Sequence, residues 1–212
     1  MKLEIEKDFL PSKIICVGRN YADHAAELGN EVPKQPLLFL KAPSAIVFDG
    51  DEIVLPAISV QVEHEAELAV VIGRDCKDIS DSEDPFQYVR GYTCLNDVTA
   101  RDLQKSDGQW TRAKGFDTFC PLGEESSELP DLESLGVITR VNGAERQRGQ
   151  STEMVFSIPT LLAYISRVMT LEPGDLVATG TPSGVGPLSP GDVVEIEIPG
   201  VSRVSNPVQG SR

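Results

Sequence analysis

The chain of 212 residues contains 33 Asp and Glu against 19 Lys and Arg, a formal net charge of −14, and 40% of its residues are hydrophobic. This composition is typical of a globular protein with a buried core, and the acidic field excludes nucleic acid and anionic lipid as expected partners. No apolar stretch approaches the length of a membrane span and the N-terminus lacks the apolar region of a secretory signal, so we expect a cytoplasmic protein.

The first half of the chain alternates short apolar runs with Gly and Pro, which predicts a strand-rich structure with few helices. Helices are expected at residues 21–28, where Gly29 ends the pattern, and from residue 99 to about residue 105. Strands are expected where short runs are rich in Val, Ile, Leu and Phe, at 14–17, 37–40, 53–55, 68–72 and 92–95.

The second half shows clear turn signals. Val141-Asn-Gly-Ala144 between two strand-like arms predicts a two-residue hairpin. A helix is expected at Ser157–Met169, with Ser157 as N-cap and Pro159 in the first turn. Pro-Gly-Asp triplets precede the strands expected at 176–179 and 193–196. Because no low-complexity linker is present, we expect one domain over residues 13–212 after a short N-terminal extension, residues 1–12.

The most informative stretch is Val62-Glu-His-Glu-Ala-Glu-Leu68, which leads directly into an apolar strand. Alternate side chains of an extended segment share a face, so Glu63, Glu65 and Glu67 are expected on one side. Their repulsion costs roughly 0.2–1 kcal/mol per exposed pair and grows with burial, whereas a cation between them turns repulsion into coordination. Such oxygen ligands favour Mg²⁺, Mn²⁺ or Ca²⁺ over zinc. The alternative is an exposed strand face with ordinary acids.

Asp97 offers a third carboxylate in a similar setting, because it follows an apolar strand and precedes a helical pattern. This position suits a metal ligand, and it equally suits a helix N-cap. The other metal-binding residue types are scarce. The four cysteines lack C-x-x-C spacing and the chain has two histidines, so a Cys/His zinc site is not expected and the thiols are interpreted as reduced, buried and structural.

His24 and Glu27 lie three residues apart in the first expected helix. At this spacing the carboxylate can bond one imidazole nitrogen and raise the basicity of the other, which makes a general base. A surface His–Glu pair is the alternative. Arg19 and Tyr21 just upstream would supply an anion clamp and a hydroxyl, or be structural.

Two further stretches complete the candidates. Arg101, Gln104, Arg112 and Lys114 gather polar and positive groups in an otherwise acidic chain, and a lysine near a metal can stabilise an enolate or carboxylate. The glycine-rich stretch 179–186 lacks the Gly-Lys-Ser/Thr ending of a nucleotide P-loop, which argues against ATP binding. Its backbone N–H groups can still bind a substrate carboxylate.

The order of these pieces resembles the fumarylacetoacetate hydrolase family, and more closely its acylpyruvase and oxaloacetate decarboxylase branch. The matching stretches span nearly the whole chain: Val17-Gly-Arg-Asn-Tyr-Ala-Asp-His24, Leu38-Phe-Leu-Lys41, His64-Glu-Ala-Glu-Leu68, Asn96-Asp-Val-Thr-Ala-Arg-Asp102, Ala113-Lys-Gly-Phe116, Val141-Asn-Gly143 and Thr179-Gly-Thr-Pro-Ser-Gly-Val-Gly186. The fold implied is α+β, a β-rich roll or mixed β-sandwich with peripheral helices, assembled as a homodimer.

The resemblance also implies roles for individual residues. Glu65, Glu67 and Asp97 would bind one Mg²⁺ or Mn²⁺, which leaves Glu63 outside the triad. His24 and Glu27 match the family's catalytic dyad, and Lys114 matches the lysine beside the metal. The positions that contact substrate or shape the pocket in relatives are Arg19, Tyr21, Arg101, Gln104 and Thr181.

The expected activity is metal-dependent cleavage of a carbon–carbon bond in a small anionic 2-oxo acid, by acylpyruvate hydrolysis or oxaloacetate decarboxylation through a metal-bound enolate. A second possibility within the family is isomerisation or decarboxylation of dienedioates in aromatic catabolism, which passes through the same kind of enolate. A different class of protein, a non-catalytic metal-binding β domain, stays open as the remote alternative.

Overall fold

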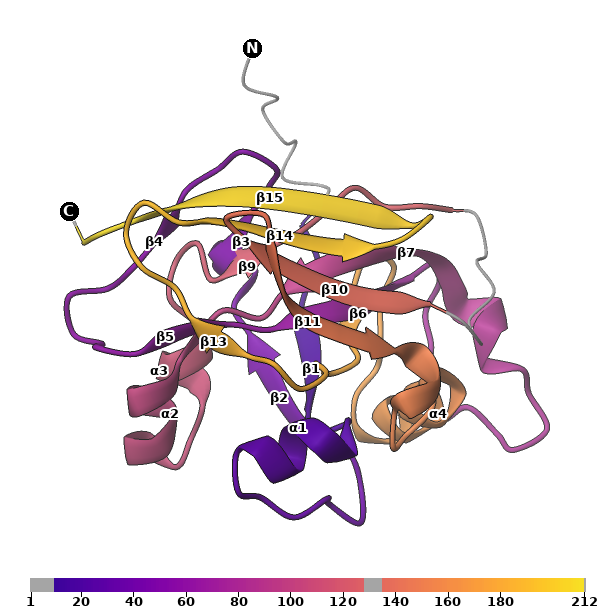
Figure 1. The fold of residues 1–212 in the computed structure, drawn as a ribbon. Coiled ribbons are helices and arrows are strands. Elements are labelled where there is room, and N and C mark those ends of the chain that lie inside the picture. The colour runs from indigo at the N-terminus through magenta and orange to yellow at the C-terminus, as the bar shows by residue number, and fades with distance from the viewer. Residues whose placement is uncertain (1–9, 128–134, 212) are drawn as a thin grey trace.

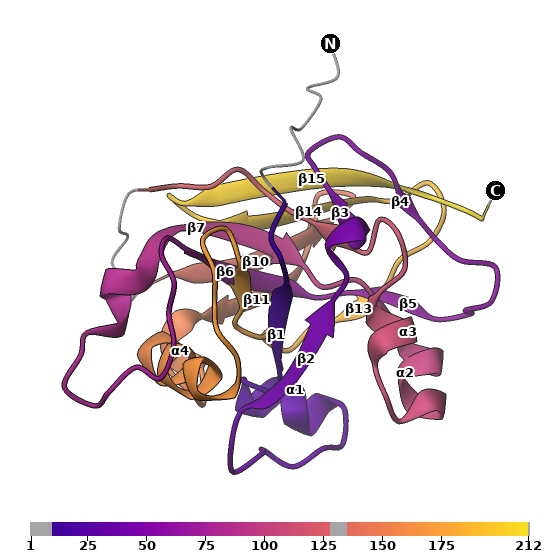
Figure 2. The same cartoon turned by 180° about the vertical axis from the view of Figure 1, so that it is seen from behind.

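A computed structural model describes residues 10–127 and 135–211 of the chain. In this part of the chain two five-stranded mixed sheets pack against each other, with helices at the periphery (Figures 1 and 2). One large hydrophobic cluster draws buried side chains from both sheets, from Ile15 to Val208. The expected α+β class and β-rich sandwich with peripheral helices are confirmed.

The first sheet has the strand order β2-β1-β12-β6-β7. Its strands span Leu37–Lys41 (β2), Ile14–Gly18 (β1), Leu176–Ala178 (β12), Ala66–Ile72 (β6) and Val89–Asn96 (β7). β1 and β12 run parallel and the other pairs are antiparallel. All seven residues of β6 are buried, as expected for a central apolar strand.

The second sheet has the order β11-β10-β14-β15-β4, with β15 and β4 parallel. Its strands span Ala144–Gln150 (β11), Gly136–Val141 (β10), Val193–Ile198 (β14), Ser202–Gln209 (β15) and Ile53–Val54 (β4). Most of β14 and β15 alternates buried with more exposed residues, because only one face of this sheet covers the core.

Smaller elements complete the described chain. Two small sheets contain Gly186–Pro187 (β13), Val62–His64 (β5) and Thr99–Ala100 (β8), and Ile46–Val47 (β3) with Cys120–Pro121 (β9). The α-helices are Ala22–Glu27 (α1), Arg101–Asp107 (α2), Thr111–Lys114 (α3) and Ile158–Val168 (α4), and 3₁₀ turns span Pro43–Ala45, Pro85–Tyr88 and Ser151–Glu153. No helix among the described residues has the length and apolar character needed to cross a membrane.

The two Pro-Gly-Asp triplets form the same turn. In residues 172–175 and 189–192 the N–H of the first residue donates to the Oδ2 of the aspartate, at 2.8 and 2.7 Å. The aspartate N–H in turn donates to the carbonyl of the first residue, at 3.0 Å in both. The third residue is glycine with φ +92° or +93°, a region that other residues adopt at a cost. The turns therefore set the starts of β12 and β14.

The predicted hairpin is confirmed, because β10 and β11 are joined by Asn142 and Gly143 with φ of +54° and +77°. The helix predicted from residue 99 is wrong at its start. Thr99 and Ala100 instead pair with β5, and α2 begins at Arg101, whose N–H donates to the Gln61 carbonyl at 2.7 Å. Tertiary pairing thus overrides the local helical pattern.

Three smaller expectations concern the start of α4, the N-terminus and the cysteines. Ser157 is the N-cap residue of α4, but its hydroxyl bonds Thr160 Oγ1 at 2.9 Å rather than a backbone N–H. The N-terminal extension expected at residues 1–12 falls outside the described residues up to residue 9. The four cysteines are free and buried, which agrees with the expectation of reduced structural thiols.

Candidate metal centre and active site

Three carboxylates meet where β6 and β7 pair. Glu65 lies at the break between β5 and β6, Glu67 on β6, and Asp97 just after β7. The Asp97 N–H donates to the Glu65 carbonyl at 2.8 Å, which brings the two residues together across the strands. Ligand oxygens of all three lie within 4.8 Å of one another, and none of the residues is more than 4% exposed. This burial rules out both the exposed strand face and, with Ala100 as the N-cap of α2, the capping role for Asp97.

Cations neutralise part of this acidic cluster. The Lys114 Nζ lies 2.8 Å from Glu65 Oε2 and 2.5 Å from Asp97 Oδ2, and the Lys41 Nζ lies 2.8 Å from Asp97 Oδ1. Sequence reasoning assigned no role to Lys41. Its one signal was a lysine at the end of an apolar strand within a matching motif.

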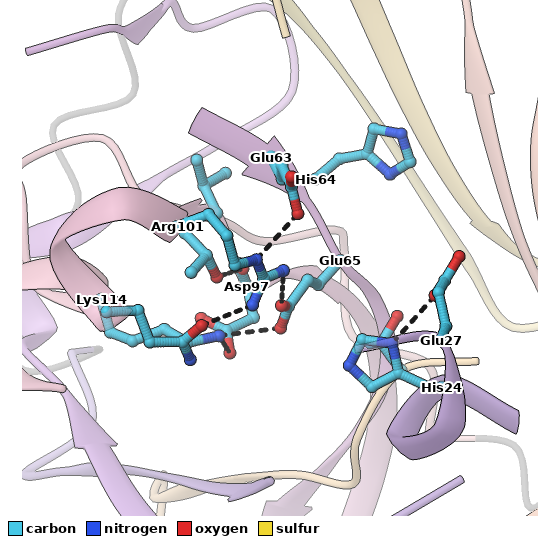
Figure 3. A network of polar contacts seen from close by, with 12 residues as sticks. His24, Glu27, Glu63, His64, Glu65, Asp97, Arg101 and Lys114 are labelled. Atoms are coloured by element: carbon cyan, nitrogen blue, oxygen red, sulfur yellow. Dashed lines mark hydrogen bonds and ion pairs between the residues drawn. The ribbon is translucent and has the colours of Figure 1, made fainter. Parts of the chain in front are cut away.

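Arg101 joins the same network (Figure 3). Its Nε donates to Glu63 at 2.8 Å, its Nη2 to Glu65 at 2.5 Å, and its Nη1 to Gln104 Oε1 at 2.6 Å. Glu63, the acid outside the expected triad, is therefore compensated by Arg101. Because the Gln104 oxygen is bonded to Arg101, the Gln104 amide NH₂ remains the group able to donate to a ligand.

Among the described residues Glu67 has no such direct ion pair, although the more distant charge of Lys114 acts on it. No Lys, Arg or His in the described chain forms an ion pair with it, and its Oε2 accepts only the Gly180 N–H, at 2.8 Å. Burial, together with the charges of Asp97 and Glu65, raises the pKa of Glu67 well above its usual range. Burial alone would also raise the pKa of Glu65, but the charges of Lys114 and Arg101 outweigh it and hold that pKa below its usual range. An all-oxygen site with one uncompensated carboxylate fits a hard divalent cation.

The predicted dyad lies beside the acidic cluster, and His24 lines the cavity described below. His24 Nδ1 lies 3.3 Å from Glu27 Oε2, and His24 is only 5% exposed, so this is not a surface pair. The Glu27 carboxylate also accepts the Gly184 N–H, at 3.0 and 3.2 Å. Figure 3 shows the dyad on α1, across from Glu65. Glu27 thus links the helix to the glycine-rich loop.

A cavity of about 380 Å³ opens between these groups. Its walls include eight of the residues predicted for the site: Arg19, His24, Glu65, Glu67, Arg101, Gln104, Lys114 and Thr181. Glu27, Asp97 and Tyr21 are not in the wall. The Tyr21 hydroxyl is buried without a hydrogen-bond partner in the described chain, and burial and the Glu67 charge raise its pKa.

Sequence reasoning missed the apolar wall of the cavity, which includes Phe39 and Trp110. Their rings meet edge to face with centroids 5.1 Å apart, and the Lys114 Nζ lies 5.0 Å above the Phe39 ring. Gly18 leaves room for this wall, because a Cβ at that position would come within 2.9 Å of the Trp110 ring and displace it. Trp110 is the single tryptophan of the chain, but no local pattern indicated that it faces the site.

One expectation about charge is corrected, and two backbone donors bind protein carboxylates. Arg112 does not join the basic set, because its guanidinium pairs on the surface with Asp107 at 2.5 Å. In the glycine-rich stretch, which could offer backbone N–H groups to a substrate carboxylate, the N–H groups of Gly180 and Gly184 donate to Glu67 and Glu27. The glycine-rich loop therefore organises protein carboxylates on both sides of the cavity.

Known proteins share this arrangement of sequence and fold. Residues 13–209 match the model of the fumarylacetoacetate (FAA) hydrolase C-terminal family. The mitochondrial oxaloacetate decarboxylase of Dictyostelium discoideum is 45% identical over 196 residues, 89% of this chain and 89% of that protein. The oxaloacetate tautomerase YisK of Bacillus subtilis is 45% identical over 212 residues, 93% of this chain and 70% of that protein.

A solved structure is also similar to this chain in fold and in sequence. The 5-carboxymethyl-2-hydroxymuconate delta-isomerase from Mycobacterium smegmatis has a TM-score of 0.88 and 47% sequence identity to this chain, covering 96% of this chain and 81% of its own.

Proposed function

Because the chain belongs to the fumarylacetoacetate hydrolase family, as its motifs indicated, we propose that it is a divalent-metal-dependent enzyme that breaks carbon–carbon bonds in small 2-oxo acids. One observation carries this proposal. Three buried carboxylates form one cluster, and two of them, Glu65 and Glu67, line the same cavity as the His24 imidazole, where Glu67 has no ion pair with a cation of the described chain. A metal-binding and a proton-accepting group thus face one small space.

Glu65, Glu67 and Asp97 would hold one Mg²⁺ or Mn²⁺, with Ca²⁺ as the alternative, since all three donors are oxygen. When bound, the cation supplies Lewis-acid polarisation of the 2-oxo group of a chelating substrate. Lys114 is placed to balance negative charge that develops beside Glu65 and Asp97. We assign substrate contacts in the cavity to Arg19, Gln104 and Thr181, and to Tyr21 and Arg101 a part in shaping the pocket.

His24 acts on a water molecule when the substrate is an acylpyruvate. With Nδ1–H donated to Glu27, Nε2 accepts a proton from water, and the water oxygen adds to the distal carbonyl. The bond between C3 and C4 then breaks, the acyl group leaves as a carboxylic acid, and the pyruvate enolate takes a proton at C3. For oxaloacetate the same bond breaks with loss of CO₂, and no water attack is needed.

Two other reactions are alternative candidates for the activity of this site. The relatives described above include a tautomerase and a delta-isomerase, whose reactions need proton transfer rather than hydrolysis. A lone imidazole facing the cavity would serve either chemistry, so keto–enol tautomerisation and dienedioate isomerisation compete with cleavage. A non-catalytic metal-binding domain would use the carboxylates for stability alone.

A substrate panel separates these activities. Purified protein with Mg²⁺ or Mn²⁺ is given acylpyruvates, oxaloacetate in its keto and enol forms, and 2-hydroxydienedioates, and kcat/KM is compared. The proposal expects metal-dependent formation of pyruvate from the first two substrates. No turnover of any member, or turnover that survives exhaustive chelation, would contradict it.

Replacing His24 tests the role of the dyad. His24→Ala should lower kcat for acylpyruvate hydrolysis by about 10²–10⁴-fold, the usual contribution of general acid–base catalysis, while Mn²⁺ still binds. Glu65→Gln is the matched comparison, and it should remove metal and activity together. Mn²⁺ affinity is measured by calorimetry. Unchanged hydrolysis in His24→Ala would show that a group other than His24 is the base.

The assembly expected from the resemblance is part of the same proposal. We propose a homodimer, with a small anionic 2-oxo acid as the one substrate of each subunit. Light scattering coupled to gel filtration should give a mass of twice the 23.0 kDa chain. A monomeric mass at micromolar concentration would overturn the dimer without affecting the chemistry.

A further inference from the structure

Gln147 lies on β11 at 1% exposure and uses its whole side-chain amide within the protein. Its Oε1 accepts from His64 Nδ1 at 3.1 Å, from the Ala66 N–H at 3.1 Å and from the Thr139 hydroxyl at 2.7 Å. Its Nε2 donates to Thr181 Oγ1 and to the Pro182 carbonyl, each at 2.8 Å. One side chain therefore joins four segments around the cavity.

The orientation of this amide is determined by backbone groups that cannot exchange roles. The Ala66 N–H can only donate and the Pro182 carbonyl can only accept, so the oxygen must face Ala66 and the nitrogen must face Pro182. If the amide were flipped, its NH₂ group would face the Ala66 N–H and its oxygen would face the Pro182 carbonyl, so neither hydrogen bond could form. His64 consequently carries its proton on Nδ1.

The oxygen side of Gln147 holds the acidic strand. Ala66 lies between Glu65 and Glu67, and its N–H has Gln147 as acceptor. Figure 3 shows His64 pointing away from Arg101, opposite to Glu63 and Glu65. The segment that joins β5 to β6 is thus bonded to β11 on one side. On the other side, the carboxylates of Glu65 and Glu67 face the cavity.

The nitrogen side of Gln147 holds the glycine-rich loop, and backbone packing supports this contact independently. A Cβ at Gly149 would lie 2.5 Å from Pro182 Cβ, and one at Gly184 would collide with the Arg146 carbonyl oxygen. The loop therefore lies directly on β11, at a distance that only glycine permits.

The hydrogen bond from Gln147 Nε2 determines how the Thr181 hydroxyl can bond. Its Oγ1 accepts from Gln147, and among residues 10–127 and 135–211 no protein group accepts the Thr181 hydroxyl proton. A hydroxyl that accepts one hydrogen bond keeps its own proton as a donor. Since Thr181 is in the cavity wall, that proton is available to a ligand oxygen.

We propose that Gln147 is a positioning residue that turns the Thr181 hydroxyl into a dedicated donor for an anionic substrate while it holds the Glu65–Glu67 strand in place. This proposal rests on the proposed function, because it takes the cavity as the 2-oxo acid site. Gln147 touches neither substrate nor metal. It acts through Thr181 and through the Ala66 N–H.

Gln147→Glu tests the nitrogen side of the amide while the oxygen side is kept. A carboxylate keeps an oxygen for His64, Ala66 and Thr139, but its second oxygen would accept the Thr181 proton and turn a lone pair toward the cavity. Binding of oxalate, an unreactive mimic of the carboxylate and 2-oxo oxygens, is measured by calorimetry in the presence of Mn²⁺. Oxalate affinity should fall about tenfold, equivalent to ~1.4 kcal/mol, with Mn²⁺ affinity unchanged.

Two comparisons distinguish positioning from a merely structural effect. In the Thr181→Val background Gln147→Glu should have no further effect on oxalate, whereas Thr181→Ser should preserve the wild-type response. Thr139→Val removes a bond to the same amide oxygen and should lower the Tm without changing oxalate affinity. An equal loss of oxalate affinity in the Thr181→Val background, or loss of Mn²⁺ together with oxalate in Gln147→Glu, would overturn the proposal.

The unfolding free energy provides a test that does not depend on ligand binding. In chelator, the effects of Gln147→Glu and Thr181→Val should be non-additive, because the two side chains share one bond. Additive effects would overturn the proposal. If wild-type protein binds no oxalate, the proposed function fails, and this cycle still decides whether Gln147 holds Thr181. Gln147→Met, of similar length and apolar, replaces Gln147→Glu in both cycles if the buried charge prevents folding.

Discussion

Glu65 and Glu67 lie two residues apart and face one cavity, yet their surroundings push their pKa values in opposite directions. Glu65 touches two cations, Arg101 and Lys114, whereas Glu67 has burial, two neighbouring carboxylates and a single backbone N–H. The difference identifies Glu67 as the residue that gains most from a bound cation. Its charge is costly without metal and useful with it.

Glu67→Gln should therefore make the metal-free protein more stable and the enzyme less active. The amide keeps an acceptor for the Gly180 N–H and can donate to the neighbouring carboxylates, so the Tm in chelator should rise by about 2–4 °C, as for ~1 kcal/mol in a chain of this size. Mn²⁺ affinity and turnover should fall together. Calorimetry and thermal melts in chelator measure the two effects.

Glu63→Gln is the matched control for this change, because Glu63 is equally buried but already paired with Arg101. It should lower the Tm and leave Mn²⁺ bound. A Tm for Glu67→Gln below that of the wild type in chelator would show that Glu67 is compensated by a group other than metal.

The raised pKa of Glu67 also predicts a pH dependence. Below the raised pKa, the metal-free folded protein carries a proton on Glu67 that the unfolded chain has already lost above its ordinary pKa of 4.5. The folded state then binds more protons, so this group's contribution to stability is lost as pH rises through the folded pKa. Cation binding must displace the same proton, so Mn²⁺ affinity should increase with pH over that window. Calorimetry at several pH values measures it, and the slope should disappear in Glu67→Gln.

At the scale of elements, the break between β5 and β6 matters more than either strand. β5 pairs with β8 and β13, whereas β6 pairs with β7 and β12, so the chain changes sheets at Glu65. The extended segment expected around these residues is therefore divided between two strands at Glu65. The three glutamates still face one side, because Arg101 contacts two of them and the cluster contains the third.

The turn before β12 also anchors the start of β1. Asp175 is fully buried, its Oδ1 accepts from the Ser12 hydroxyl at 2.8 Å and the Lys13 N–H at 3.1 Å, and its Oδ2 lies 2.6 Å from Lys13 Nζ. These contacts hold together the beginnings of two parallel strands. Asp192 occupies the same position in the second turn but is half-buried and has no lysine partner in the described chain.

Asp175→Ala should consequently cost about 2–3 kcal/mol of unfolding free energy, because it removes the charged acceptor of several hydrogen bonds at a buried position. Asp192→Ala loses mainly the turn hydrogen bonds and should cost ~1 kcal/mol. Urea unfolding of both variants measures the difference. Equal costs would mean that the turn itself, rather than the junction with β1, accounts for the stabilisation.

At the scale of the whole molecule, the cation and the fold should stabilise each other. The carboxylates come from two strands of one sheet, and they converge only in the folded chain. A ligand that binds only the folded state at 100 times its Kd adds ~2.7 kcal/mol of stability. For a chain of this length we expect Mn²⁺ to raise the Tm by about 5–10 °C over chelator. Identical melting curves in Mn²⁺ and chelator would argue against a specific site.

Local sequence determined the parts of this protein that depend on neighbours along the chain. Apolar runs predicted most strands, and the Asn142-Gly143 pair predicted its hairpin, because φ > 0 is inexpensive for these residue types. The order of motifs was enough to predict the family, and with it the sandwich and the three carboxylates. The start of α2 was misjudged because pairing of residues 99 and 100 with β5 is not encoded locally.

The tertiary structure alone decided which residues meet around the cavity. Phe39, Trp110 and Gln147 had no local signal for their positions, and Lys41 had only its place in a matching motif. Arg112 looked like a site residue but pairs on the surface. The bond from Gly184 to Glu27 joins residues 157 apart in the chain. Contacts at such separations follow from sheet order and loop packing, which a single sequence does not display, because local patterns encode the conformation of a segment and not its partner.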